Sequence, residues 1–332
     1  MLPERLIAKF EQMKILVTFR TMNGQRTLLE ICFDKDAEII FMEDYPADMR
    51  GNLLSDTDII LSWNPEQEGL FSAGITSERV KFIQLLSAGY DHINLESFPK
   101  EIKIAANQGA YASPMAEHAA AMMLALSKRL FVYHNQLAEE KFNQLKSFTK
   151  SVNNAVLGII GFGSIGKATS RLMNPFGVRI LALNKTGKTD EEVEFIGTLK
   201  DLDYVLKNCD ILLIACPLND ETNGLINKHK LEIMKDDAVL INVARGQILD
   251  EQDLYEHLKS HPNFYAGIDA WWVEPFKYGK FVINYPFFEL PNLLGSPHNS
   301  AMVDDAILKG TEKAAKNVIR FINNEKIVGL IN

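Results

Sequence analysis

The 332-residue sequence is poor in cysteine, with only Cys32, Cys209 and Cys216. Their spacing matches neither a zinc-ligand pattern nor a disulfide framework. We therefore predict no metal site and a protein of a reducing compartment, the cytoplasm. Cys209 and Cys216 lie in or beside apolar runs, where we expect them to be small buried hydrophobic side chains.

The sequence also lacks a long apolar run and a block of charge of one sign. Its first residues, MLPERLIAKFEQM, carry charges on both sides of a short apolar patch, and no stretch reaches the length that spans a membrane. The net charge is −8, with acidic and basic residues interspersed. We therefore expect neither a membrane nor a nucleic-acid partner, whereas a small anionic substrate in a local basic pocket is compatible with this pattern.

Short aliphatic runs alternate with amphipathic stretches along the chain, which is typical of parallel βαβ units. Fully apolar strands of this kind belong in a sheet covered on both faces. Because the length suits two domains, we predict an α/β protein with two Rossmann-like or flavodoxin-like domains, each with a parallel sheet. The runs expected to form strands are KILVTF, AEIIFM, TDIILSW, KFIQLL and IKIAA in the first third, then NAVLGII, VRILAL, CDILLIAC, DAVLINV, YAGIDAW and NLLGS.

Three helices stand out. The stretch SPMAEHAAAMMLALSKRLFVYHNQLAEEKF predicts one long helix, with Ser113 as its cap, Pro114 at the first helical position and Glu117 in the first turn. Its length favours a crossing between domains or a subunit interface over a simple core helix, which stays open. Asp250 is expected to cap DEQDLYEHLKS, and one amphipathic helix is expected from about Ser300 to Phe321.

A glycine-rich turn follows the strand at Asn154 and opens a helix. Gly161 permits a tight turn, Gly163 lets the main chain approach a pyrophosphate, and Gly166 lets the helix pack closely on its strand. The positive end of that helix would face the pyrophosphate. We predict a dinucleotide site here; a turn that serves packing alone is the alternative.

The stretch LALNKTGK, beginning at Leu181, decides which dinucleotide is expected. An NAD site usually has a carboxylate there to accept hydrogen bonds from the ribose. Here the place holds Asn184, Lys185, Thr186 and Lys188, which can meet the charge of a 2′-phosphate or donate hydrogen bonds to it. We predict that NADP(H) is preferred and that NAD(H) is possible; a solvated lysine loop is the alternative.

Three polar residues follow successive predicted strands, where open α/β sheets hold their ligands. They are Arg245, Glu274 and His298. A guanidinium can grip a carboxylate, an imidazolium can protonate a ketone oxygen, and a carboxylate beside the imidazole stabilises its charged form and its orientation. Taken singly, each has an ordinary explanation: a surface arginine, a turn glutamate and a locally satisfied histidine. Their joint arrangement suits reduction of a 2-keto acid.

Motifs in order along nearly the whole chain now identify a family. The chain resembles the D-isomer-specific 2-hydroxyacid dehydrogenases, which include glyoxylate and hydroxypyruvate reductases, phosphoglycerate dehydrogenases and formate dehydrogenases. The motifs that carry the resemblance are SAGYDHI, AEHAAAMMLAL, GIIGFGSIGKATSRL, LNDETNGLINKHKLEIMKDDAVLINVARGQILDEQDLYEHL, AGIDAWWVEP and SPHNSA.

The resemblance implies roles for these residues. It makes Arg245 the substrate-binding arginine, Glu274 the partner of the histidine and His298 the general acid/base. Asp269 would lie near the nicotinamide carboxamide, and the N–H groups around Ala88 and Gly89 would hold the substrate carboxylate. The remaining cofactor contacts that we predict are Phe162, Ser164 and Ile165 in the glycine turn, together with Cys216, Pro217, Val243 and Ala244.

The family also implies a domain order and an assembly. The substrate domain would comprise residues 1–112 and 302–332, with the dinucleotide-binding domain, 113–301, inserted between them. A homodimer is expected. Among the other histidines, His92 and His118 are expected to be structural, and solvated surface positions are expected for His134, His229, His257 and His261.

Differences between this sequence and particular members of the family narrow the range of expected substrates. Trp63 and Asn64 stand where phosphoglycerate enzymes tend to carry an arginine, and the segment before His298 lacks the glutamine of formate dehydrogenases. We predict reduction of a small unphosphorylated 2-keto acid such as glyoxylate or hydroxypyruvate, with Trp63 at the substrate pocket or else in the core. The alternatives are a phosphoglycerate-type dehydrogenase without a regulatory domain and a dinucleotide-sensing binding protein on the same fold.

Overall fold

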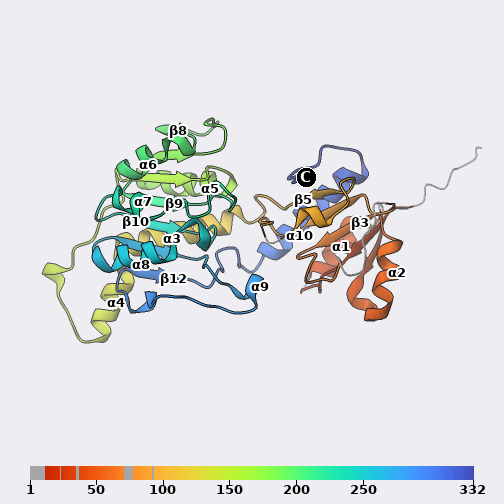
Figure 1. Ribbon diagram of the computed structural model, residues 1–332, viewed down its shortest axis with the longest axis horizontal. Helices are drawn as coiled ribbons and strands as arrows, with labels where there is room; N and C mark the ends of the chain where they lie inside the picture. Colours follow the sequence, from red (N-terminus) through yellow and green to blue (C-terminus); the bar gives the residue numbers. More distant parts are fainter. Residues whose placement is uncertain (1–11, 23, 35–36, 71–77, 92) are drawn as a thin grey trace, which may run out of the picture. The chain divides into compact units, whose positions relative to one another are not determined.

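Two parallel β-sheets organise the chain, one in each of two units (Figure 1). The computed structural model describes residues 12–332 apart from 23, 35–36, 71–77 and 92. One unit contains the residues up to Ala110 together with Asp304–Asn332, and the other contains Tyr111–Val303. The predicted fold class, two α/β units with parallel sheets, is confirmed.

The first unit has a five-stranded sheet of order β2-β1-β3-β4-β5, the flavodoxin-like order, and all its strand pairs are parallel. Side chains alternate between its two faces. Ile15 and Val17 of β1 pack in the core under α1 and α10, whereas Leu16 packs in the core that includes Leu54 of α2. The elements are β1 (Lys14–Val17), α1 (Gln25–Phe33), β2 (Glu38–Phe41), α2 (Arg50–Ser55), β3 (Ile59–Ser62), β4 (Phe82–Leu85), β5 (Lys103–Ala105) and α10 (Ala306–Ile322).

The second unit has a seven-stranded parallel sheet of order β12-β11-β10-β9-β6-β7-β8. Its edge strand β8 was not predicted. The strands are β6 (Val156–Ile160), β7 (Arg179–Leu183), β8 (Phe195–Gly197), β9 (Ile211–Ile214), β10 (Val239–Asn242), β11 (Tyr265–Ile268) and β12 (Leu293–Gly295). The helices are α3 (Ala112–Ser127), α4 (Leu130–Ala138), α5 (Ser164–Met173), α6 (Leu202–Asn208), α7 (Lys228–Glu232), α8 (Glu251–Ser260) and α9 (Pro275–Tyr278).

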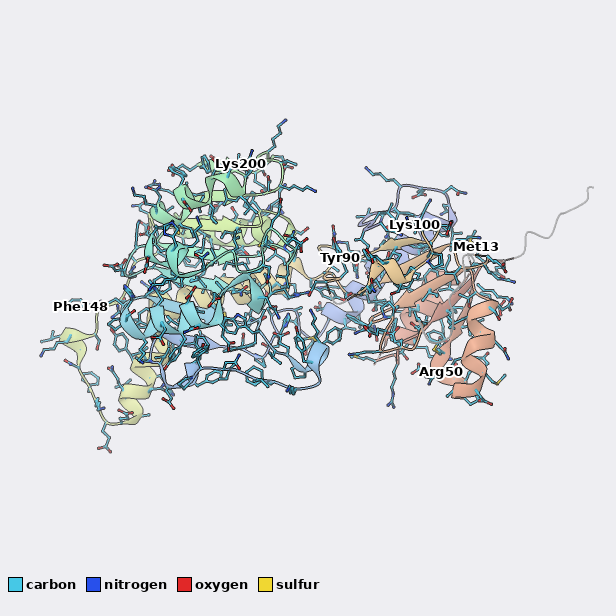
Figure 2. The ribbon with its side chains drawn as sticks, in the orientation of Figure 1. Met13, Arg50, Tyr90, Lys100, Phe148 and Lys200 are labelled. Atoms are coloured by element: carbon cyan, nitrogen blue, oxygen red, sulfur yellow. The ribbon has the colours of Figure 1, made fainter. Side chains whose placement is uncertain are left out.

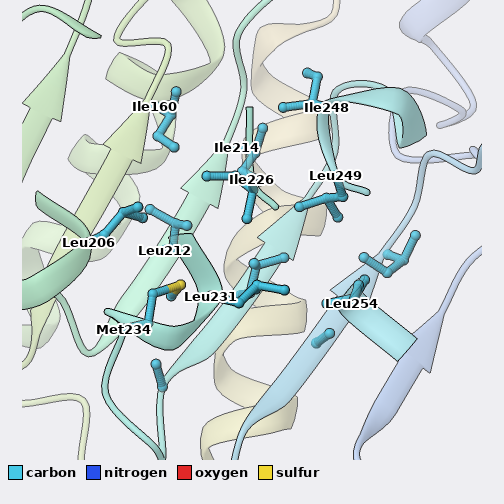
Figure 3. Packing of buried hydrophobic residues seen from close by; sticks show 14 of the residues in the cluster. Ile160, Leu206, Leu212, Ile214, Ile226, Leu231, Met234, Ile248, Leu249 and Leu254 are labelled. Carbon is cyan, nitrogen blue, oxygen red and sulfur yellow. The ribbon is translucent and has the colours of Figure 1, made fainter. Parts of the chain in front are cut away.

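Apolar cores cover both faces of the second sheet, as the uninterrupted aliphatic strands predict. Leu157 and Ile159 of β6 face the core built with α3 and α5, and Ile160 faces the opposite core, built with α6, α7 and α8. Figure 3 shows part of the latter core, where Leu206 of α6 lies beside the strand residue Leu212. This packing holds the strand ends, where the polar residues lie, in a rigid frame.

The single long helix predicted from Ser113 is wrong. The chain forms two helices, α3 and α4, separated at Arg129, whose φ of 50° is left-handed. Nothing local marks this break, because no Gly or Pro is present; instead the Arg129 guanidinium lies over the Tyr265 ring, 5.1 Å from its centre. The start also differs: Tyr111 occupies the cap position, and the Ser113 hydroxyl bonds Glu117 within the helix.

The last helix begins later than predicted, at Ala306 instead of about Ser300. The segment before it is not helical, and there the main-chain N–H groups of Asn299 and Ser300 donate to the carboxylate of Asp269. The predicted cap of α8 is confirmed, because the Asp250 side chain accepts a hydrogen bond from the N–H of Asp253 at 2.9 Å.

Cys209 and Cys216 are buried as predicted, and burial raises the pKa of both thiols to about 12. The surface prediction is wrong for His257, which is buried, stacks on His261 and contacts the edge of Phe264; burial lowers its pKa to about 4. His134 and His229 are exposed, and His261 is half-buried.

Two further sequence predictions concern His92 and the N-terminal stretch. His92 and residues 1–11 lie outside the described part. Among the described residues, no helix is long and apolar enough to cross a membrane, and no three His, Cys, Asp or Glu side chains gather as metal ligands.

Candidate active site

Arg245, Glu274 and His298 follow three neighbouring strands. The strands β10, β11 and β12 pair in parallel, so their carboxyl ends meet at one edge of the second sheet. Arg245 comes just after β10, Glu274 follows β11 at the start of α9, and His298 follows β12. The placement at successive strand ends that the sequence predicted is therefore present, at the edge where open α/β sheets bind ligands.

His298 and Glu274 form a direct pair. The Nδ1 atom of His298 lies 2.6 Å from Oε2 of Glu274. The other oxygen of Glu274 accepts a hydrogen bond from the N–H of Trp271 at 2.6 Å, which fixes the carboxylate. Because a carboxylate accepts, Nδ1 carries a proton, and the opposite nitrogen, Nε2, is left to exchange a proton with a ligand. The imidazole is one-third exposed, enough for a small molecule to reach it.

The main chain at His298 is strained, and Asp269 holds it. His298 has a φ of 50°, in the left-handed region that costs a non-glycine residue free energy. Its N–H donates to the main-chain oxygen of Asp269 at 2.9 Å. The fully buried Asp269 carboxylate accepts from the N–H groups of Asn299 and Ser300 and from the Ser296 hydroxyl. This carboxylate is therefore satisfied by the segment that carries His298.

Arg245 is positioned by a buried asparagine at the end of β10. The Asn242 side chain accepts from the N–H of Ala244 at 3.0 Å and donates to the main-chain oxygen of Arg245 at 2.8 Å. Arg245 is half-buried, and its Nη1 donates to the oxygen of Ala244. Asn242 and Ser296 were not predicted as site residues from the sequence. Their only local signal is a polar residue at the end of an otherwise apolar strand.

The glycine turn leaves room for a ligand at one of its three glycines. Gly161 has a φ of 96°, and a Cβ there would lie 2.4 Å from the N atom of Cys216. A Cβ at Gly166 would meet the oxygen of Gly161 at 2.6 Å. A Cβ at Gly163 would meet nothing within 4 Å. Gly161 and Gly166 are thus required by packing, whereas the open space at Gly163 fits the close approach of a pyrophosphate.

The other turn residues differ in what they can offer. Phe162 is buried in the core, and its N–H donates to the oxygen of Leu183, so only its carbonyl faces outward. Ser164 and Ile165 begin α5, whose first-turn N–H groups have no partner within the helix. Since β6 continues to β7 on one side and is flanked by β9 on the other, this turn lies at the point where the strand order reverses, the usual dinucleotide site.

Four more predicted cofactor contacts lie at the same edge. Cys216 and Pro217 follow β9, and Val243 and Ala244 follow β10. The Val243 side chain is fully buried, so only its main chain can face a ligand. The buried Ser300 hydroxyl, in the segment after β12, has no hydrogen-bond partner among the described residues, which fits a polar group of a bound ligand.

The loop after β7 is folded by Asn184. Its Oδ1 accepts from the N–H groups of Thr186 and Gly187, and its Nδ2 donates to the oxygen of Lys188. Lys185, Thr186 and Lys188 are exposed, and neither lysine forms an ion pair within the part of the chain that the structure describes. The next two carboxylates along the chain are already engaged, Asp190 by Lys167 and Glu191 by Arg171.

In the first unit, the predicted substrate residues also follow strands. Trp63 comes directly after β3. Its ring and that of Phe19 form a T-shaped pair, with 6.3 Å between the ring centres. Ala88 and Gly89 follow β4, the neighbour of β3. The loop after β3 is held by the half-buried Glu68, which accepts from the hydroxyls of Thr18 and Ser62 and from two main-chain N–H groups. Burial raises the pKa of this carboxyl.

Comparison with known proteins settles the family. The sequence model of the D-isomer specific 2-hydroxyacid dehydrogenase, NAD binding domain, matches residues 120–300. The chain belongs to this family. One relative, the glyoxylate reductase of Thermococcus gammatolerans, is 30% identical over 262 residues, which cover 76% of this chain and 77% of the relative. The hydroxypyruvate reductase of Thermotoga maritima is 32% identical over 231 residues, 69% of this chain and 73% of the relative.

A solved structure agrees. D-Lactate dehydrogenase from Aquifex aeolicus, crystallised with NAD and lactic acid, matches with a TM-score of 0.73 at 25% identity, covering 94% of this chain and 96% of that one. As a D-2-hydroxyacid dehydrogenase, this protein is an oxidoreductase that uses a nicotinamide dinucleotide. The open space at Gly163 and the free N–H groups of α5 fit that cofactor.

Proposed function

We propose that this dehydrogenase reduces a small unphosphorylated 2-keto acid to the D-2-hydroxy acid with NADPH. The observation that carries the proposal is the His298–Glu274 pair, which lies beside Arg245 at adjacent strand ends of a dinucleotide-binding fold. In this assignment residues 113–301 form the dinucleotide-binding domain, and residues 1–112 with 302–332 form the substrate domain.

Each site residue has its own role in the proposed reaction. The bound cofactor supplies a hydride for the keto carbon. The Arg245 guanidinium binds the carboxylate and keto oxygens of the substrate, and the N–H groups at Ala88 and Gly89 hold the carboxylate. His298 gives the proton on its Nε2 to the keto oxygen, so that C=O becomes CH–OH. Glu274, fixed by Trp271, stabilises the imidazolium before that transfer and keeps the ring in place.

The substrate class follows from what stands at the strand ends of the first unit. Trp63 offers an apolar ring at the end of β3, and Asn64 beside it is uncharged, so this loop carries no cation for a phosphate. Two relatives are named for glyoxylate and hydroxypyruvate reduction. A two- or three-carbon keto acid is therefore the first choice.

NADP(H) is proposed as the preferred cofactor, because residues 184–188, directly after β7, include no carboxylate to accept the ribose hydroxyls. Lys185 and Lys188 are exposed there, while Asp190 and Glu191 are engaged by other cations. Asn184 contributes by folding the loop, and Thr186 offers a hydroxyl. Two exposed lysines, with the two carboxylates that follow them in the sequence engaged by other cations, favour a 2′-phosphate over a 2′-hydroxyl.

The test is a panel of keto acids measured with both cofactors. Glyoxylate and hydroxypyruvate are expected to support oxidation of NADPH, with a larger kcat/KM than with NADH, and 3-phosphohydroxypyruvate is expected to be a poor substrate. Preference for the phosphorylated acid would favour the phosphoglycerate-type alternative. No turnover with any keto acid, combined with tight dinucleotide binding, would favour the sensing protein instead.

A homodimer is proposed from the segment that follows α4. Within it Phe142, Leu145 and Phe148 are 79%, 88% and 75% exposed, an apolar surface that a second copy would cover. Figure 2 labels Phe148 on this segment, at the left of the view. Changing all three residues to Ser is expected to halve the mass measured by light scattering. Phe176→Ser, at another exposed ring, is the control. A triple variant that stays dimeric excludes this interface, and a monomeric wild type excludes the homodimer.

A further inference from the structure

A chain of hydrogen bonds joins helix α3 to the segment that carries His298. Nε2 of His118, on α3, lies 3.0 Å from the hydroxyl of Ser296, and that hydroxyl donates to Oδ1 of Asp269 at 2.5 Å. Because the single hydroxyl proton goes to the carboxylate, Ser296 must accept from His118. His118 therefore carries a proton on Nε2, 3.7 Å from the same carboxylate oxygen.

Asp269 connects these hydrogen bonds to the segment that carries His298. It is fully buried. Its main-chain oxygen accepts from the N–H of His298, and its carboxylate accepts from the N–H groups of the next two residues, Asn299 and Ser300. A buried carboxylate is costly unless its hydrogen bonds are all made, so its orientation depends on each donor. The same orientation maintains the strained left-handed backbone at His298.

We propose that His118 is a positioning residue of the active site, acting through Ser296 and Asp269 to hold the main chain that aims the His298 imidazole at Glu274. Without the donor on His118, the Ser296 hydroxyl is free to turn away and the Asp269 carboxylate loses one fixed partner. The segment 296–300 then relaxes out of its strained form and the ring moves.

A packing role for His118, the one expected from the sequence, makes the opposite prediction about substitutions. His118→Phe keeps a ring in the same space and removes the donor. His118→Gln removes the ring and keeps an N–H at similar reach. If His118 serves packing, Phe should be tolerated better than Gln; if it serves the hydrogen-bond chain, Gln should be tolerated and Phe should not.

The experiment compares four variants in the full-length protein with NADPH and the best keto acid. His118→Phe and Ser296→Ala are each expected to lower kcat by about 10–100-fold with little change in KM, the usual result of a small misplacement of a reacting group. The kcat of His118→Gln should stay within about threefold of the wild type. The kcat of the double variant His118→Phe/Ser296→Ala should be no lower than that of either single variant, since both substitutions interrupt the same series of hydrogen bonds. His134→Phe, at an exposed position on α4, is the control.

Amide hydrogen exchange supplies a readout that does not depend on turnover. The N–H groups of His298, Asn299 and Ser300 should exchange at least about tenfold faster in His118→Phe than in the wild type, and near the wild-type rate in His118→Gln. Wild-type kcat and exchange in His118→Phe, or equal damage in the Gln variant, would overturn the proposal. This inference rests on the proposed function only for kcat: if no keto acid is reduced, that function fails while exchange still decides the role of His118.

Discussion

Replacing His298 by Ala is expected to lower kcat for keto-acid reduction by about 10²–10⁴-fold, the usual contribution of a positioned acid/base. The imidazole is paired with Glu274 at 2.6 Å through Nδ1, so the proton available to a substrate is the one on Nε2. The alanine variant has no group that can take this place, and water must protonate the ketone oxygen. Because Arg245 and the glycine turn are untouched, KM for both substrates should change little.

Steady-state kinetics of NADPH oxidation provide the measurement, and dinucleotide binding by fluorescence confirms that the variant is folded. His229→Ala is the matched control, since His229 is exposed on α7 and distant in sequence from the strand ends. Turnover of His298→Ala within about threefold of the wild type would contradict the acid/base role, because proton transfer by a side chain is worth far more than that.

The cofactor preference is expected to shift when the lysines after β7 are removed. In Lys185→Ala/Lys188→Ala, the ratio of kcat/KM for NADPH to that for NADH should fall by about 10–100-fold, since the two charge-assisted contacts to a phosphate together contribute roughly 1.4–2.8 kcal/mol. The loss should appear as a higher KM for NADPH with unchanged KM for NADH. Asn184 is left in place, because its side chain folds the loop through Thr186, Gly187 and Lys188.

Two further variants sharpen this result. Lys207→Ala removes an exposed lysine from α6 in the same unit and should leave the ratio unchanged. Asn184→Asp adds a carboxylate that repels a 2′-phosphate and should lower the ratio further. An unchanged ratio in the double lysine variant would mean that the loop is only a solvated surface.

Strand positions and strand ends were predictable because the signal is local. The centres of runs such as CDILLIAC and DAVLINV, ILLIA and AVLI, have no polar residue that could face water, so they are expected to be strands covered on both faces. Once strands are parallel, the residues that follow them share an edge, which is why Arg245, Glu274 and His298 could be grouped before any coordinates. The glycine turn was equally predictable from the sequence. Gly161 has a φ of 96° and lies against the main chain of Cys216, where only glycine fits.

Features decided by contacts far apart in the sequence were missed. The break between α3 and α4 lies at Arg129, whose partner Tyr265 is more than one hundred residues away. His257 follows the polar pattern of a surface helix, yet it is enclosed by Phe264 and His261. α10 begins after a non-helical segment in which the N–H groups of Asn299 and Ser300 donate to Asp269, a residue distant in the sequence.

The sequence alone therefore determined the class of fold, the family and the residues that stand at the strand ends, because alternation, glycine and motif order are properties of neighbouring residues. Tertiary structure alone decided how the main chain at His298 is held: its strained conformation and its link through Asp269 and Ser296 to His118 on α3. These groups meet only after two strands and a helix have packed, and hydrogen bonds between such distant segments leave no periodic trace in the sequence.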